Sequence, residues 1–272
     1  MENKIYIGDC YEVLKKLPSN FFQLMVTSPP YWNVRDYGHK EQIGFYDTLD
    51  EYLEKLNPIW KEIVRTLLPD GKIALNIANV YYNEPDEKRK TTANISMLLW
   101  QQLNAIEELR FMGTIYWQKT TSRDGSVLFG SYPYPTNFMI SNAVEPIHIF
   151  RKQGNRNVSQ DIKEKSKVTL EEFRKFRDAI WNDINGVEDK HSAAYPVELP
   201  KRLIQMFSYW NDWILDPFLG SGSTMKAANE LERNSLGIEL NPDFLERIKE
   251  KVKVNQSDIF QENNFEIIME KQ

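Results

Sequence analysis

Two short segments of the chain combine residue types that could bind a nucleotide-like ligand and act on it chemically. The first, from Thr27 to Trp32, reads TSPPYW, and the second, from Asp216 to Thr224, reads DPFLGSGST. Each follows a short apolar run, at 22–26 and 213–215, of the kind that forms a buried strand. Ligands of open α/β sheets bind beyond the carboxyl ends of the strands, so both segments stand where a site is expected.

The glycine-rich segment is typical of a cofactor site. Gly220 and Gly222 lack a Cβ, so their backbone can approach a ligand closely. A second short strand at 235–239 ends in Glu239, at roughly the 20-residue spacing where an acid meets ribose hydroxyls in such folds. Met225 replaces the third glycine of a dinucleotide site, and no GxxxxGK[ST] motif is present, which argues against NAD and ATP. A plain strand-to-helix turn is the alternative.

The proline-rich segment favours catalysis by positioning. Two prolines fix the backbone and stiffen the loop. The Ser28 hydroxyl and the Pro29 carbonyl could accept both N–H groups of an exocyclic amine, and the Tyr31 ring could stack on a flipped base. Direct transfer to that amine, without a covalent enzyme–base intermediate, is the chemistry that these groups suit. Taken alone, the motif could equally be a proline turn or a ligand for a proline-binding module.

In this order the two motifs resemble those of the beta-class amino-methyltransferases of DNA, found in restriction-modification systems and as orphan enzymes. The resemblance extends from residues 5–9 (IYIGD) through 69–72 (PDGK) to Glu239. It implies an α/β, Rossmann-like, S-adenosylmethionine-dependent methyltransferase fold that is circularly permuted, with a seven-stranded, mostly parallel sheet and a small target-recognition insertion. It also implies S-adenosylmethionine as the cofactor. Ala78-Asn79 departs from the Gly-Asp that relatives often carry after the strand at 73–77.

The resemblance implies a role for each motif residue. Cofactor contacts would come from Asp9 near the adenine, Glu239 at the ribose, Asp216, Phe218, Gly220 and Gly222 at the methionine end, and Tyr195 within the segment His191–Pro196. The target base would be held by Ser28, Pro29, Pro30 and Tyr31. Serine at the head of the motif is commoner in N4-cytosine enzymes, so we expect cytosine N4 as the acceptor. The alternatives are adenine N6, an RNA or protein substrate, and a catalytically silent DNA-binding module.

Composition limits the class of protein. Hydrophobic residues make up 41% of the 272 residues, enough for a packed core in one large domain. No apolar run approaches the ~18 residues of a membrane span, and the N-terminus lacks a secretory apolar region, so we expect a cytoplasmic protein without membrane contact. The single cysteine, Cys10, lacks the Pro-Cys context of carbon methylation and is expected in the core. His39, His148 and His191 are too scattered for a metal site, and His148 is expected in the core.

The remaining sequence predicts how these segments are positioned. Strands are expected at 4–7, 22–26, 72–78, 111–117, 145–150, 212–216 and 235–239, and helices near 11–17, 49–67, 94–109, 197–209, 223–232 and 242–254. We assign 1–150 and 191–272 to the catalytic core, with a mobile loop at 119–142. Residues 35–38 could order over the base or cap the next turn.

Residues 151–190 are expected to form the target-recognition region. Trp181, Asn182 and Asn185 could reach base edges there, or could pack locally. The net charge of −5 is unusual for a DNA-binding protein, but an excess of Lys and Arg at 151–177 could contact phosphates. Double-stranded DNA is the expected partner, and a cognate restriction endonuclease and a second copy of the chain are further candidates.

Overall fold

The computed structural model describes residues 3–84, 90–119, 135, 140–186, 195–253 and 265–270. Its strands are β1 (Asn3–Ile7), β2 (Phe22–Thr27), β3 (Leu67–Asn76), β4 (Val80–Asn83), β5 (Lys90–Ala93), β6 (Leu109–Gln118), β7 (Val144–Lys152), β8 (Ile180–Trp181), β9 (Trp213–Asp216), β10 (Asn234–Glu239) and β11 (Phe265–Met269). Its helices are α1 (Cys10–Lys16), α2 (Leu49–Thr66), α3 (Ile95–Asn104), α4 (Gln160–Lys165), α5 (Leu170–Phe176), α6 (Glu198–Phe207), α7 (Ser223–Glu230), the 3₁₀ turn η2 (Pro242–Phe244) and α8 (Leu245–Val252).

One sheet runs through this part of the chain in the order β11-β1-β10-β9-β2-β3-β7-β6-β8. Only β7 runs against its neighbours, since both β3 and β6 pair with it antiparallel and the other pairs are parallel. All seven predicted strands are present, and β8 and β11 extend the sheet at its two edges. The α/β fold with a mostly parallel sheet is therefore confirmed, with two more strands than expected and a separate β4–β5 hairpin.

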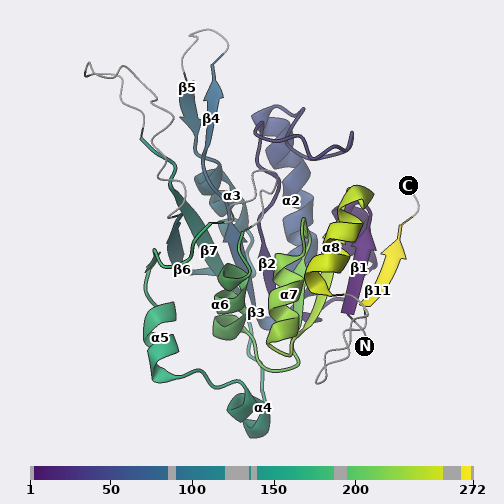
Figure 1. The fold of residues 1–272 in the computed structure, drawn as a ribbon, viewed down its shortest axis with the longest axis vertical. Helices are drawn as coiled ribbons and strands as arrows, with labels where there is room; N and C mark the ends of the chain where they lie inside the picture. The colour runs from purple at the N-terminus through teal and green to yellow at the C-terminus, as the bar shows by residue number, and fades with distance from the viewer. Residues whose placement is uncertain are drawn as a thin grey trace.

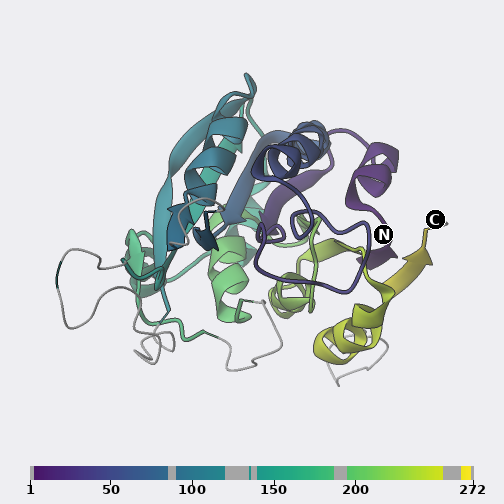
Figure 2. The same cartoon turned by 90° about the horizontal axis from the view of Figure 1, so that it is seen from above.

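Helices cover both faces of the sheet (Figures 1 and 2), and the alternation of side chains along β2 shows why. Met25 points into the core cluster that α1, α2 and α3 complete, whereas Leu24 and Val26 point into the cluster completed by α6 and α7. Successive strand residues face opposite sides, so a strand that is apolar at every position needs a cover on both. All six residues of β2 are buried.

The chain leaves the centre of the sheet in two directions. From β9 it passes through α7 to β10, whereas from β2 it passes through α2 to β3, on the other side of the β2–β9 boundary. Such a switch point opens a crevice at the carboxyl ends of the two strands. The two predicted motifs begin there, one at the end of each strand.

The first half of the predicted target-recognition region lies at the opposite end of the parallel strands. Lys152 donates hydrogen bonds to the carbonyls of Val64 and Leu67, at 2.8 and 2.7 Å, where β3 begins. Arg156 pairs with Asp212 just before β9, at 2.5 and 3.0 Å. Figure 1 shows α4 at the bottom of the molecule, away from the strand ends that carry the motifs. Residues 152–167 thus lie away from the end of the sheet that carries the motifs, and their role in target recognition stays a prediction.

Trp181, one of the predicted base-reading residues, packs inside the protein. Its side chain is 1% exposed and lies 5.4 Å from the guanidinium of Arg202, which also forms a two-point ion pair with Asp183. The sequence allowed either base contact or local packing for Trp181, and the structure shows local packing. Asn182 and Asn185 are exposed. Most of the predicted loop at 119–142, and residues 191–194, lie outside the described residues.

Candidate active site

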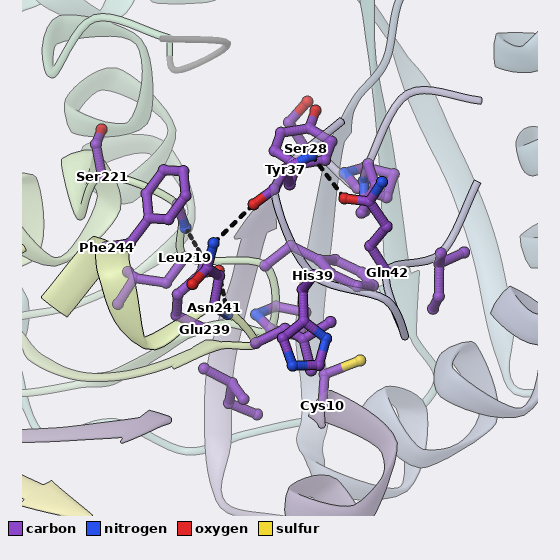
Figure 3. A pocket seen from close by; sticks show the side chains of 18 of the residues that line it. Cys10, Ser28, Tyr37, His39, Gln42, Leu219, Ser221, Glu239, Asn241 and Phe244 are labelled. Atoms are coloured by element: carbon purple, nitrogen blue, oxygen red, sulfur yellow. Dashed lines mark hydrogen bonds between the residues drawn. The ribbon is translucent and has the colours of Figure 1, made fainter. Parts of the chain in front are cut away.

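A pocket opens at the carboxyl ends of β1, β2, β9 and β10 (Figure 3). It spans about 1080 Å³ if the open solvent at its mouth is included. Of the residues predicted for the site, only Asp216 and Gly222 do not line it. The others that do are Asp9, Ser28, Pro29, Pro30, Tyr31, Tyr195, Phe218, Gly220 and Glu239.

Asp216 instead joins the two loops from beneath the pocket. One carboxylate oxygen accepts from Thr27 Oγ1 at 2.6 Å and the other from Thr224 Oγ1 at 2.6 Å, while the Tyr195 hydroxyl donates at 3.2 Å and the Phe218 amide at 3.2 Å. Burial raises the pKa of this carboxyl, and these hydrogen bonds oppose the rise. Asp216 therefore bridges the loops that carry Ser28 and Phe218, and its contact with the methionine end of the cofactor stays a prediction.

The two motif glycines also have different roles. Gly220 has φ +55°, and a Cβ built on it would meet nothing within 4 Å, so its missing side chain leaves the pocket open. Gly222 has φ +87°, and its Cβ would come within 3.3 Å of Val252 and 3.4 Å of Ile248 in α8. Gly222 therefore allows α7 and α8 to pack closely, and its contact with the ligand stays a prediction.

Glu239 faces the pocket from the end of β10. Its Oε2 accepts the Gly220 N–H at 2.8 Å and its Oε1 accepts the Asn241 N–H at 2.9 Å. Burial raises the pKa of Glu239 to about 7, against those two hydrogen bonds. Each carboxylate oxygen has lone pairs left for a ligand hydroxyl. Asp9, at the end of β1, caps α1 by accepting the Glu12 N–H at 3.0 Å.

The proline loop is fixed from the side of α2. The Tyr52 hydroxyl donates to the Pro30 carbonyl at 2.9 Å, and the Trp32 indole donates to the Asp47 carbonyl at 2.9 Å. Ser28 Oγ lies 3.5 Å from the Tyr31 hydroxyl, whose pKa is raised by burial. A stiff loop held at several points suits the expected role in positioning a substrate.

Several lining residues were not predicted for the site. Cys10 was expected only in the core; it is 6% exposed, burial raises its pKa, and it also lines the pocket (Figure 3). The segment after the proline loop was noted only for residues 35–38. The further lining residues are Gly8, Arg35, Tyr37, His39, Glu41, Gln42, Ile43, Pro217, Leu219, Ser221, Ser223, Ile238, Leu240, Asn241 and Phe244.

His148 is a core residue, as expected. Its ring nitrogens lie 2.7 Å from Ser96 Oγ and 2.9 Å from Thr114 Oγ1, and burial lowers its pKa to about 4. Within the described ranges no three His, Cys, Asp or Glu side chains group as metal ligands would. No helix in the described part of the chain has the length and apolar character to cross a membrane.

Comparisons with known proteins identify the family. The N6/N4 methyltransferase family model, described as DNA methylase, matches residues 22–250. The chain belongs to this family of DNA amino-methyltransferases. It is 31% identical to the Type II methyltransferase M.MjaI of Methanocaldococcus jannaschii, over 98% of this chain and 96% of that protein.

Solved structures agree with the fold. TTHA0409 of Thermus thermophilus, solved with S-adenosyl-L-methionine, superposes with a TM-score of 0.79 at 28% identity, covering 99% of both chains. The PvuII cytosine-N4-specific DNA methyltransferase has the same fold, with a TM-score of 0.65 at 20% identity, covering 95% of this chain and 89% of that one. The chain is accordingly an S-adenosylmethionine-dependent amino-methyltransferase of DNA.

The pocket fits this cofactor. Gly220 leaves open space beside the glycine turn, as a ligand that lies against backbone requires. Glu239 presents carboxylate lone pairs to the same space, and Leu219, Ile238 and Phe244 supply apolar walls. A nucleoside linked to an amino acid needs this combination of an acceptor, an apolar slot and an open turn.

Proposed function

We propose that the methyl acceptor is N4 of cytosine in double-stranded DNA, held as a flipped-out base beside Ser28. The observation that supports this most strongly is that the Ser28–Tyr31 loop and the Gly220–Glu239 pair line one pocket. Serine at the head of the loop favours cytosine over adenine. Adenine N6 is the second candidate, because its amine could be held by the same acceptors.

The chain's own contribution to the reaction is orientation. An exocyclic amine is a poor nucleophile because its lone pair is delocalised into the ring. Ser28 Oγ and the Pro29 carbonyl would accept its two N–H groups and so turn the lone pair toward the cofactor. The Tyr31 ring would stack on the base. When bound, the cofactor would supply an electrophilic sulfonium methyl group. The amine nitrogen would bond to that methyl carbon in line as the carbon–sulfur bond breaks, with S-adenosylhomocysteine as the leaving group. One proton of the amine would pass to water, and no covalent bond to the protein would form.

The cofactor would lie along the other wall of the pocket. Glu239 would accept the ribose hydroxyls, and Asp9 would lie near the adenine. Phe218 and Gly220 would contact the methionine end, and Tyr195 would support it from below. In this arrangement the base and the methyl donor meet between β2 and β9, where Asp216 holds the two loops together.

The DNA duplex would approach the pocket end of the sheet. The β4–β5 hairpin rises beyond that end (Figure 1), and its Tyr82 packs 5.3 Å from the Trp32 ring, directly after the proline loop. Asn83, Lys90 and Thr92 are exposed along it and carry hydrogen-bond donors. We assign phosphate and base contacts to this end of the molecule rather than to residues 152–167.

Within the predicted recognition region, residues 180–186 are the part that suits DNA contact. Ile180 pairs with Tyr116, close to the carboxyl end of β6, so the chain after it continues toward the pocket end of the sheet. The exposed side chains of Asn182 and Asn185 are the candidates for base contacts there. A cognate endonuclease, a homodimer and a cytoplasmic location stay predictions.

The base assignment is tested by incubating the protein with S-adenosylmethionine and unmethylated genomic DNA, digesting the DNA to nucleosides and analysing them by mass spectrometry. N4-methylcytosine is the expected product. Detection of N6-methyladenine instead would leave the mechanism unchanged and identify adenine as the target base. Cofactor binding without either product would overturn DNA amino-methylation by this chain.

A further inference from the structure

The pocket has a base wall, formed by the Ser28–Tyr31 loop, and a cofactor wall, which includes Gly220 and Glu239. Residues 36–42, which we call the strap, lie across the pocket between these two walls. Its shape is held by its own side chains. Gln42 is 4% exposed; its Oε1 accepts the Tyr37 N–H at 2.6 Å and its Nε2 donates to Asp36 Oδ1 at 3.0 Å. Asp36 Oδ1 also accepts the Gly38 N–H at 2.8 Å. The strap is therefore a preformed unit that can transmit a displacement from one wall to the other.

Asn241 ties the strap to the cofactor wall. Its Nδ2 donates to the Tyr37 carbonyl at 2.7 Å, and its backbone N–H donates to Glu239 Oε1 at 2.9 Å (Figure 3). Its Oδ1 accepts the Asp243 N–H at 2.9 Å and so caps η2. Gly38 has φ +78°, and a Cβ there would lie 3.3 Å from Asn241 Nδ2, so the contact is close.

Tyr37 lines the pocket together with Tyr31 of the proline loop. Its phenol is buried, which raises its pKa, and it lies close enough to Tyr31 to contribute to the raised pKa of that phenol. Hydrogen bonds thus run from Gly220 through Glu239 and Asn241 to Tyr37, which lines the same pocket as Tyr31 of the proline loop. The path does not use Asp216, which joins the same two loops from below.

We propose that Asn241 is a positioning residue that couples cofactor occupancy to the geometry of the proline loop. A cofactor whose ribose engages Glu239 fixes the position of Asn241, which then holds Tyr37 and, through it, Tyr31. The base-binding surface is ordered before the base arrives, so the two ligands bind cooperatively. This inference rests on the proposed function for the identity of the two ligands.

The coupling is measured as the ratio of DNA dissociation constants without and with saturating S-adenosylhomocysteine. The DNA is a fluorescent duplex carrying the sequence that the wild-type protein methylates in genomic DNA. We expect a ratio of about 5 or more in the wild-type protein, within the usual range of roughly 5 to 150 for coupled sites. The same factor must appear when the affinity for S-adenosylhomocysteine is measured with and without the duplex.

Two substitutions of Asn241 remove its hydrogen bond to the Tyr37 carbonyl and keep a side-chain oxygen that can cap η2. Asn241→Ser retains an oxygen that can cap η2 but has no amide to reach Tyr37. Asn241→Asp keeps the shape and the cap, and it places an acceptor against the Tyr37 carbonyl. The matched control is Asn234→Ser, which removes an exposed amide that bonds Asn211 at 2.8 Å, at the start of β10, the strand that ends in Glu239.

We expect the ratio to fall below about 2 in both Asn241 variants and to be unchanged in Asn234→Ser, with the melting temperature reported for each. If Asn241→Ser lowered the melting temperature but kept the wild-type ratio of DNA dissociation constants, Asn241 would have only a structural role and the inference would be overturned. A ratio of 1 in the wild-type protein would also overturn the inference. Failure of the wild-type protein to bind S-adenosylhomocysteine would instead contradict the proposed function itself, and the inference with it.

Discussion

Thr27 donates a 2.6 Å hydrogen bond to Asp216, although the two residues are 189 positions apart in the sequence. They are the last residues of β2 and β9, whose backbones pair at Leu24 with Ile214 and at Met25 with Leu215. The side-chain bond extends this pairing to the point where both functional loops begin. It fixes the separation between the base wall and the cofactor wall, which is the quantity that a positioning mechanism depends on.

Thr27→Val should therefore impair both stability and turnover. The buried Asp216 carboxylate loses one of its donors, which costs about 1–3 kcal/mol, and Ser28 is no longer held in register with Phe218. Urea unfolding and steady-state methylation would measure the two effects. Thr66→Val is the matched control, because its buried hydroxyl only donates to the Ile63 carbonyl at 2.8 Å. Equal turnover in the two variants would mean that the Thr27–Asp216 bond has no role in positioning.

Glu239 should make cofactor binding depend on pH. Its pKa is raised to about 7 by burial, so the carboxylate that accepts ribose hydroxyls is largely protonated at pH 6 and ionised at pH 8. The affinity for S-adenosylhomocysteine should rise by about tenfold from pH 6 to pH 8. Calorimetry would measure it, with Glu239→Gln as the control because Asp9 and His39 share the pocket. If the affinity of Glu239→Gln rose with pH as much as that of the wild-type protein, the group responsible for the pH dependence would not be Glu239.

The two motif glycines should respond differently to alanine. Both have positive φ, so each substitution strains the backbone by about 1–2 kcal/mol. Gly222→Ala also crowds Val252 and Ile248, so it should lower stability more than Gly220→Ala, yet leave affinity for S-adenosylhomocysteine within about threefold. Gly220→Ala points a methyl group into the pocket and should weaken that affinity by about tenfold or more. If Gly220→Ala lowered stability more and Gly222→Ala weakened binding more, the roles assigned to the two glycines would be reversed.

The sequence predicted the strands and loops that make the site because each signal is local. Apolar runs that end in Thr27, Asp216 and Glu239 predict buried strands with polar ends, and the glycine and proline motifs follow directly. The family resemblance then placed these elements next to each other. Helix boundaries agreed within a few residues, as for α2, predicted at 49–67 and observed at Leu49–Thr66.

What could not be predicted depends on contacts between distant segments. Nothing local in residues 152–167 shows that Arg156 pairs with Asp212 at the far end of the sheet, so a charged, weakly periodic stretch looked suitable for DNA. The motif match gives Asp216 a ligand role but does not reveal that Thr224 and Thr27 donate to its carboxylate. Nothing local indicated a role for Asn241, because its bond to Tyr37 needs the folded strap.

The most direct test of the account is Ser28→Ala, measured for both the rate of N4-methylcytosine formation under single-turnover conditions and the affinity for S-adenosylhomocysteine. Ser28 belongs to the base wall, and its hydroxyl lies 3.5 Å from that of Tyr31. We predict a rate lower by about 10²-fold, as expected when an amine is no longer held in line, with cofactor affinity within about twofold of the wild-type value. A cofactor affinity that falls in step with the rate, or a rate that does not change, would contradict the assignment of Ser28 to the target base.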